Sequence, residues 1–299
     1  MTFIQNGVDF RAHYGSWAEF VDAAAVPRQP GVNDTALSRQ VESGAFTGVR
    51  TFEDAVKLAR DGWPEVSAEI ERLASRITAG VLQHVERPEV FFGYEGVQYD
   101  VGRLLDGEPE HWQYWSPVEE TLRGSGRVCR ILYNVAISGG IDGSIIRARG
   151  AAVGALCRAL DYVGIRAEVT ITDGTGGTAP NAQGFVNVTL KQADQDIDYP
   201  VFAYAIAHPS TLRRLVFSVQ ETFPATIRAN YGFGNPYGSF YGYPADLPAA
   251  ERAAYDIHVD SAMLGDAQWT KPESAIAWVL GKLAEQGVTI REEATACTR

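Results

Sequence analysis

Residues 128–138 read VCRILYNVAIS, and residues 139–144 continue the chain with GGIDGS. A nearly continuous apolar run of this length is typical of a strand buried on both faces of a sheet, and the glycine-rich stretch after it is typical of a loop. Residues 145–163 then place apolar side chains on one face, which predicts a long helix that Gly164 ends. Residues 167–172 alternate as a second strand does. This order predicts a βαβ unit with parallel strands and a right-handed crossover.

The rest of this half repeats the alternation. We predict strands at 185–191 and 255–259, a helix at 200–221 broken at Pro209, a closing helix at 272–286 and a short edge strand at 288–290. The expected fold is therefore α/β, with a doubly wound, mainly parallel sheet.

The first half of the chain has a different pattern. Residues 1–45 are expected to be a loosely structured lead-in, and residues 51–82 a helical hairpin. Residues 90–97 predict a strand, a turn and a strand, residues 100–115 are rich in acidic and aromatic side chains, and residues 124–126 are a hinge candidate. We therefore predict a mostly helical or mixed N-terminal region at 1–123, an α/β domain at 127–291 and a polar tail at 292–299.

Three features of residues 127–291 resemble von Willebrand factor A (vWA) domains. A buried strand ends in a Ser/Gly/Asp loop, a long helix ends in LDYVGI and leads into RAEVTIT, and a final helix reads SAIAWVLGKLAEQGV. Across the chain, SGAFTGVRTFEDAVKLARDGWPE, YDVGRLLDGEPEHW and AYAIAHPSTLRRLVFSVQE resemble a family of tailed-phage proteins that has no assigned chemistry. The resemblances imply a vWA- or Rossmann-like fold and a phage origin.

The vWA resemblance also implies a metal-ion-dependent adhesion site, which in that family is built on Asp-x-Ser-x-Ser. One alignment places Asn134, Ala136 and Ser138 at those positions and loses the carboxylate; another places Ser138, Gly140 and Asp142 there. The motif is therefore degenerate.

A modified site remains open at the same corner. Ser138 ends the first predicted strand, and Asp142 and Asp173 lie in loops that follow predicted strands; their side-chain oxygens are ligands that Mg²⁺ prefers. The alternative, which we favour, is that Asp142 and Ser144 cap the helix that follows. No cofactor is predicted, and Mg²⁺ is the one metal that this corner suggests.

Two other clusters are candidate binding residues. His208 directly precedes the Pro209 break, and Arg213 and Arg214 follow it. The arginines can bind a carboxylate or phosphate; alternatively, the polar side chains beside Pro209 satisfy the backbone groups that the helix break leaves unpaired. The loop at 230–248 is rich in Tyr and Gly. Its candidate contact residues are Tyr231, Tyr237 and Tyr241. Such a loop either binds a partner or packs over the sheet.

The composition narrows the class of partner. The net charge of -11 argues against nucleic acid, which needs a basic face. Three widely spaced cysteines indicate neither a zinc ribbon nor a disulfide framework. The start lacks the apolar core of a signal peptide, and no apolar run is long enough to cross a membrane, so we expect a cytoplasmic protein of the host cell, or one carried in a virion.

These observations favour a binding role over catalysis. The leading hypothesis is a non-enzymatic phage-type protein whose vWA-like module mediates protein–protein association or assembly, with a host or phage protein as partner. One alternative is a metal-dependent enzyme or regulator at the Ser138, Asp142 and Asp173 corner. Another is a virion structural component.

Overall fold

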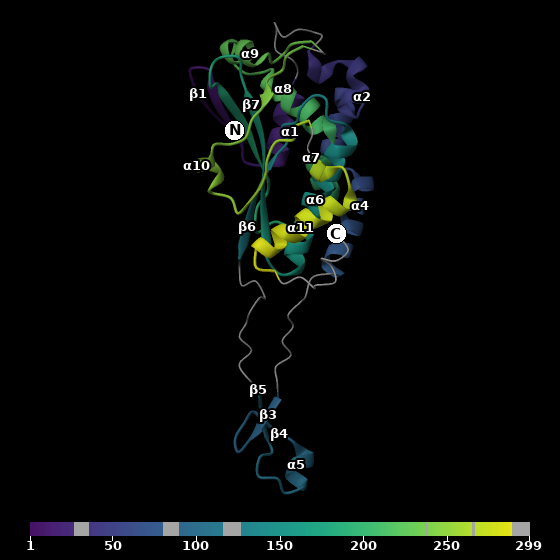
Figure 1. Ribbon diagram of the computed structural model, residues 1–299, viewed down its shortest axis with the longest axis vertical. Helices are drawn as coiled ribbons and strands as arrows, with labels where there is room; N and C mark the ends of the chain where they lie inside the picture. The colour runs from purple at the N-terminus through teal and green to yellow at the C-terminus, as the bar shows by residue number, and fades with distance from the viewer. Residues whose placement is uncertain (27–35, 80–89, 116–126, 237–238, 265–266, 289–299) are drawn as a thin grey trace.

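The computed structural model describes residues 1–26, 36–79, 90–115, 127–236, 239–264 and 267–288 (Figure 1). The predicted hinge at 124–126, the tail at 292–299 and Tyr237 lie outside these residues, as does the predicted edge strand apart from Val288. The chain is a mixed α/β protein built on a largely parallel central sheet.

Seven strands form the central sheet. In spatial order they are β1 (Thr2–Asn6), β2 (Asp9–Tyr14), β8 (Gln183–Lys191), β7 (Arg166–Gly176), β6 (Val128–Asn134) and β10 (Ile257–Val259), with β9 (Tyr243–Pro244) also paired to β7. The pairs β2–β8, β7–β6 and β6–β10 are parallel, whereas β1–β2 and β8–β7 are antiparallel. The predicted βαβ unit is confirmed as β6, α6 (Gly143–Tyr162) and β7.

The pairing of β7 with β8 differs from a uniformly wound parallel sheet. Residues 177–182 connect these two strands directly, and a connection that short closes a hairpin but cannot carry a crossover. The two strands are therefore antiparallel, with Thr172 opposite Asn187.

The expectation of a loosely structured lead-in at residues 1–45 was wrong for its first part. Phe10, Ala12 and Tyr14 alternate with polar residues and bury their side chains against the core, which is the period of a strand with one buried face. Because β2 pairs with β8, the central sheet takes strands from both sides of the expected boundary at residues 123–127. The two halves share one sheet.

The long helices contribute to one common core, and Figure 1 shows them gathered on one side of the sheet. They are α1 (Trp17–Ala25), α3 (Phe52–Asp61), α4 (Pro64–Ala79), α6, α7 (Tyr199–Ala207) and α11 (Pro272–Glu285). Cys129, Ile131 and Tyr133 of β6 face this core, while Leu132 packs on the opposite face in a small cluster with Phe185 and Leu247.

The predicted helical hairpin is confirmed. Thr51 and Asp54 form a capping box at the start of α3, in which each side chain accepts the other residue's backbone N–H. Gly62 ends α3 with a φ of 87°, and a Cβ there would lie 2.4 Å from the Cβ of Pro200. The hairpin therefore lies tightly against the start of α7.

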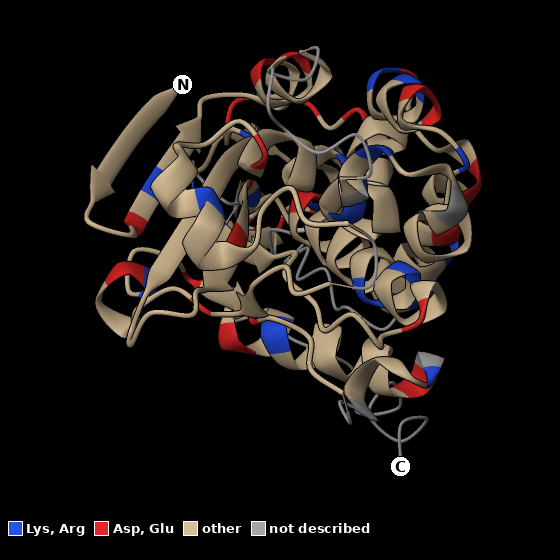
Figure 2. Cartoon of the chain, turned by 90° about the horizontal axis from the view of Figure 1, so that it is seen from above, with Lys and Arg blue, Asp and Glu red and all other residues tan. Residues whose placement is uncertain are grey.

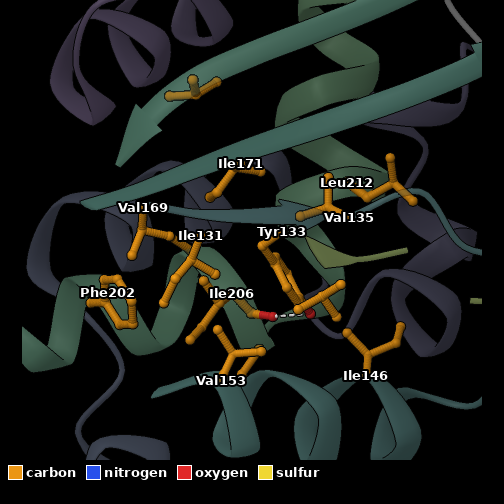
Figure 3. Close-up of a cluster of buried hydrophobic side chains, with 14 of the residues drawn as sticks. Ile131, Tyr133, Val135, Ile146, Val153, Val169, Ile171, Phe202, Ile206 and Leu212 are labelled. Atoms are coloured by element: carbon orange, nitrogen blue, oxygen red, sulfur yellow. Dashed lines mark hydrogen bonds between the residues drawn. The ribbon is translucent and has the colours of Figure 1, made fainter. Parts of the chain in front are cut away.

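Small residues allow α6 to approach its neighbours closely. A Cβ added at Gly150 would lie 2.5 Å from Ala207 of α7, and one at Gly154 would lie 2.6 Å from Ile70 of α4. Figure 3 shows the apolar side chains between β6, α6 and α7, with the Tyr133 hydroxyl donating to the Ile206 carbonyl oxygen at 2.8 Å.

The chain also has shorter helices and turns. They are α2 (Gly44–Thr47), the π-helix η3 (Thr211–Val216), α8 (Phe217–Gln220), α9 (Ala225–Tyr231), α10 (Ala249–Arg252) and the 3-10 turns η1 (Leu37–Arg39), η2 (Val41–Ser43) and η4 (Ala267–Trp269). The predicted break at Pro209 is confirmed, because α7 ends at Ala207 and η3 begins at Thr211.

Residues 90–115 form a second, three-stranded sheet of their own, which we call the 90–115 module. It contains β3 (Val90–Gly93), β4 (Gln98–Tyr99), α5 (Val101–Leu105) and β5 (Trp112–Trp115), labelled in Figure 1. The order β3-β5-β4 places β5 in the centre, so the predicted strand, turn and strand of 90–97 do not pair with each other. The partner of both strands comes from the aromatic stretch further along the chain.

Candidate functional site

The loop after β6 holds the first predicted site residues. The Asp142 carboxylate accepts the backbone N–H of Ser144 at 2.8 Å and caps α6, so the capping role predicted for Asp142 is confirmed. The capping role predicted for Ser144 is wrong, because Ser144 lies inside α6 and donates its backbone N–H to the cap. Hydrogen bonds from the Ser144 side chain and backbone, with the charge of Arg213, hold the pKa of Asp142 below its usual value. Ser138 donates its backbone N–H to Ala262 and thereby joins this loop to the segment after β10.

Asp173 lies within β7, and its side chain is 3% exposed. Its Oδ2 accepts from the Thr175 hydroxyl at 2.9 Å and from the Gln220 amide at 2.6 Å. Burial raises the pKa of this carboxyl to about 6, although both hydrogen bonds lower it. Across the described ranges, no three His, Cys, Asp or Glu side chains are grouped so that they could hold a metal ion.

His208 belongs to a buried chain of hydrogen bonds. Its Nδ1 accepts from the Ser210 backbone at 3.1 Å and lies 2.7 Å from the Ser210 hydroxyl, which is 2.7 Å from the Tyr204 hydroxyl. Burial lowers the pKa of His208 to about 4, so the imidazole is neutral at pH 7.

A serine beside a neutral histidine is the start of a nucleophile–base pair. Ser210, however, is fully buried, and the cavity beside His208 has a volume of about 10 Å³, room for about one water molecule. These side chains instead provide hydrogen-bond partners for one another and for the backbone between the end of α7 and the start of η3. The geometry therefore supports the alternative that this cluster satisfies the broken helix and does not bind a ligand.

Arg213 and Arg214 point into the protein and bind backbone carbonyl groups. Arg213 donates to Phe46 at 2.7 Å and to Ile141 at 2.9 Å, and its guanidinium lies over the Phe46 ring. Arg214 donates to Ser38 at 2.8 Å, with further bonds to the backbone near the start of α3. Both arginines join η3 to residues 36–50.

Figure 2 shows basic and acidic positions both on the outside of the molecule and among its central elements. The basic positions inside include Arg149, which is 1% exposed. Its guanidinium donates to the carbonyl oxygens of Asn134, Val259 and Asp260 and lies over the Tyr133 ring. Arg149 therefore ties the end of β6 to the end of β10.

The described part of the aromatic loop packs largely inward. Tyr231 is fully buried and meets the Phe10 ring edge-on at 5.2 Å. The Tyr241 ring lies tilted against the Phe217 ring with centroids 4.1 Å apart, and its hydroxyl donates to the Glu221 carboxylate at 3.1 Å. Of the two readings of this loop, these contacts favour packing over the sheet.

The exposed apolar side chains gather elsewhere, on the 90–115 module. Nine of the seventeen exposed large hydrophobic residues in the described chain lie within it, although it is a small part of the sequence. They are Val90, Phe91, Tyr94, Val97, Tyr99, Val101, Leu104, Leu105 and Tyr114. The most exposed are Leu105 at 80%, Val97 at 76% and Tyr94 at 71%.

The module has no core of its own among the side chains that are described. None from Val90 to Tyr114 is buried, and none joins the core of the central sheet. Its internal contacts are local: Arg103 lies over the Phe92 ring at 4.1 Å and pairs with Glu108, while Asp100 caps α5. Such a small sheet gains little stability alone, and clustered apolar exposure marks contact surfaces.

This surface was not among the residues predicted to form a site. The sequence shows that residues 90–115 are rich in apolar and aromatic side chains, but only the structure shows that the strands there are too short to bury them.

The fold and its surfaces define a mixed α/β protein that carries a small β-rich module with clustered apolar exposure. The chain belongs to the family described as domain of unknown function DUF7192, whose model matches residues 4–290 and thus includes the module. No curated protein and no solved structure matches the chain. None of the described helices is both long and apolar enough to cross a membrane.

Proposed function

We propose that this protein binds another protein and serves in association or assembly, with the 90–115 module as the contact surface. The observation that carries the proposal is the cluster of exposed apolar side chains on a module in which no described side chain is buried. Burying one large apolar side chain contributes about 1.5–3 kcal/mol, so a few such residues supply the affinity of a specific contact.

The other predicted site residues support this choice by what they already do. Asp142 caps a helix, Asp173 is hydrogen-bonded within the core, and Arg214 binds backbone carbonyl groups. The βαβ unit β6–α6–β7 has the strand–helix–strand order on which the vWA resemblance rests. The resemblance to tailed-phage proteins supports an assembly role in the host cytoplasm or in the virion.

The test is quantitative affinity capture with three forms of the full chain. A module variant carries Tyr94→Ser, Val97→Ser and Leu105→Ser. A control variant carries Ile4→Ser and Leu264→Ser, which remove apolar side chains that are 61% and 69% exposed outside the module. The proposal predicts a partner retained by the wild type and the control and lost from the module variant. Equal retention by all three, with the module variant still folded, would refute it.

A further inference from the structure

Some charged side chains of the 90–115 module form contacts within the module, and others do not. Arg103 is its one basic residue besides His111, and this guanidinium is already paired with Glu108 and lies over Phe92. Asp100 accepts the Arg103 backbone N–H at 3.0 Å and the Gln113 amide at 3.1 Å. His111 meets the Glu108 carbonyl oxygen at 2.7 Å. These groups hold the module together.

Three carboxylates are left over. Glu95, Asp106 and Glu110 are exposed, and within the described residues no hydrogen bond or ion pair involves their side chains. Glu95 lies between the exposed Tyr94 and Val97 along the chain, and Asp106 follows Leu105. The surface of the module therefore places unpaired negative charge directly beside its most exposed apolar side chains.

The charge balance narrows the class of partner. The module carries five acidic residues (Glu95, Asp100, Asp106, Glu108 and Glu110) and one arginine, a formal net charge of 1 − 5 = −4. A second copy would bring the same −4 to the contact, and nucleic acid or an anionic lipid surface would bring further negative charge. Opposite charges on the two partners of an interface speed their association and disfavour partners of like charge.

We infer that the partner of the module is a polypeptide whose apolar face is bordered by lysine or arginine side chains, as in a basic amphipathic segment. This inference rests on the proposed function, because it names the partner chemistry of the same surface. The apolar side chains supply affinity, while Glu95, Asp106 and Glu110 select the charge of the partner. Exposed ion pairs are each weak, so losing all three is expected to weaken binding by about 10-fold.

The experiment titrates the full chain with three short amphipathic peptides of one pattern, made of leucine with lysine, with glutamate or with glutamine. The charge variant is Glu95→Gln, Asp106→Asn and Glu110→Gln. A matched control, Glu65→Gln, Glu71→Gln and Asp194→Asn, changes the net charge equally at exposed sites outside the module. Binding is measured by fluorescence anisotropy at 0.1 M and 1 M salt, since the Debye length falls from about 10 Å to about 3 Å.

We expect the leucine–lysine peptide to bind most tightly, to lose about 10-fold in affinity with the charge variant and to bind the control variant as it binds the wild type. High salt is expected to remove the preference for lysine. Equal weakening by both variants would overturn the inference, because net charge alone would then explain the binding. So would equal binding of the lysine and glutamine peptides.

The module variant with three serines separates the two proposals. If it loses all three peptides while the charge variant loses none, the apolar contact surface stands and the inferred partner charge is wrong. If the serine variant binds the leucine–lysine peptide as the wild type does, the module is not the contact surface and the proposed function fails with it.

Discussion

Asp173→Asn is expected to change how the stability of the protein depends on pH. The carboxyl is 3% exposed, and burial raises its pKa from 3.8 to about 6. The folded protein therefore holds this proton more tightly than the unfolded chain does. Stability from this group is fully present below about pH 4 and is lost as the pH rises to about 6, because folding then requires a buried carboxylate.

The size of the effect follows from the two pKa values. Their difference is about two, and each unit corresponds to about 1.4 kcal/mol, so ionisation of Asp173 lowers the free energy of unfolding by about 3 kcal/mol at pH 7. Asparagine has nearly the same shape and stays neutral. The variant and the wild type should therefore differ little at pH 4, and the variant should be more stable by up to about 3 kcal/mol at pH 7.

Urea denaturation at several pH values between 4 and 7 measures this difference. His208 has a folded pKa of about 4, and its contribution changes in the opposite direction, being lost as the pH falls from about 6.5 to 4. That contribution is present in both proteins and cancels in the comparison. Asp194→Asn, at an exposed residue, is the control. A constant difference between Asp173→Asn and the wild type across this range would refute the reasoning.

Three further predictions concern packing. Replacing residues 90–115 with a short Gly/Ser linker should leave the free energy of unfolding within about 0.5 kcal/mol, because no side chain from Val90 to Tyr114 joins the core; a larger loss in urea denaturation would contradict this. Gly150→Ala should lower the free energy of unfolding by about 2–3 kcal/mol, because the added methyl group clashes with α7. Gly281→Ala, at a helical position with open space, should raise the free energy of unfolding by about 0.5–1 kcal/mol. Calorimetry measures both effects, and equal effects would contradict the packing argument. Arg149→Met should lower the free energy of unfolding by roughly 3 kcal/mol, because it leaves buried carbonyl groups of β6 and β10 without a donor. Hydrogen exchange should then show that β10 opens first. Unchanged exchange in β10 would contradict the claim that Arg149 holds β6 and β10 together.

Local pattern was enough to predict the βαβ unit and the helical hairpin. The apolar run of β6, the long amphipathic helix α6 and the Thr51 cap each report on residues close in sequence. The pairing of β2 with β8 joins residues more than 170 positions apart, as in Phe10 opposite Gly184, and no local pattern encodes it. For that reason the sequence alone predicts a loose lead-in where the structure has β1 and β2.

The candidate sites show the same limit. The residue types at 208–214 predict ligand contacts, but the Arg214 guanidinium donates its hydrogen bonds to backbone carbonyl groups within residues 38–50. Only the fold brings those carbonyl groups close to Arg214. Likewise, a Tyr/Gly-rich segment reads the same whether it binds a partner or covers Phe10, and burial decides between the two for Tyr231. The contact surface of the 90–115 module cannot be predicted from sequence, because exposed apolar residues on short strands have the same pattern as residues of a buried core.

Site-specific photocrosslinking tests the central claim most directly. Leu105→p-benzoylphenylalanine places a crosslinker at the most exposed apolar position of the 90–115 module, and the same substitution at Leu264 places it on an exposed site outside the module. After irradiation in the cells that produce the protein, mass spectrometry identifies the adducts. The account predicts a defined protein adduct from position 105 that is absent from position 264. Adducts of the same proteins from both positions, or from position 264 alone, would contradict it.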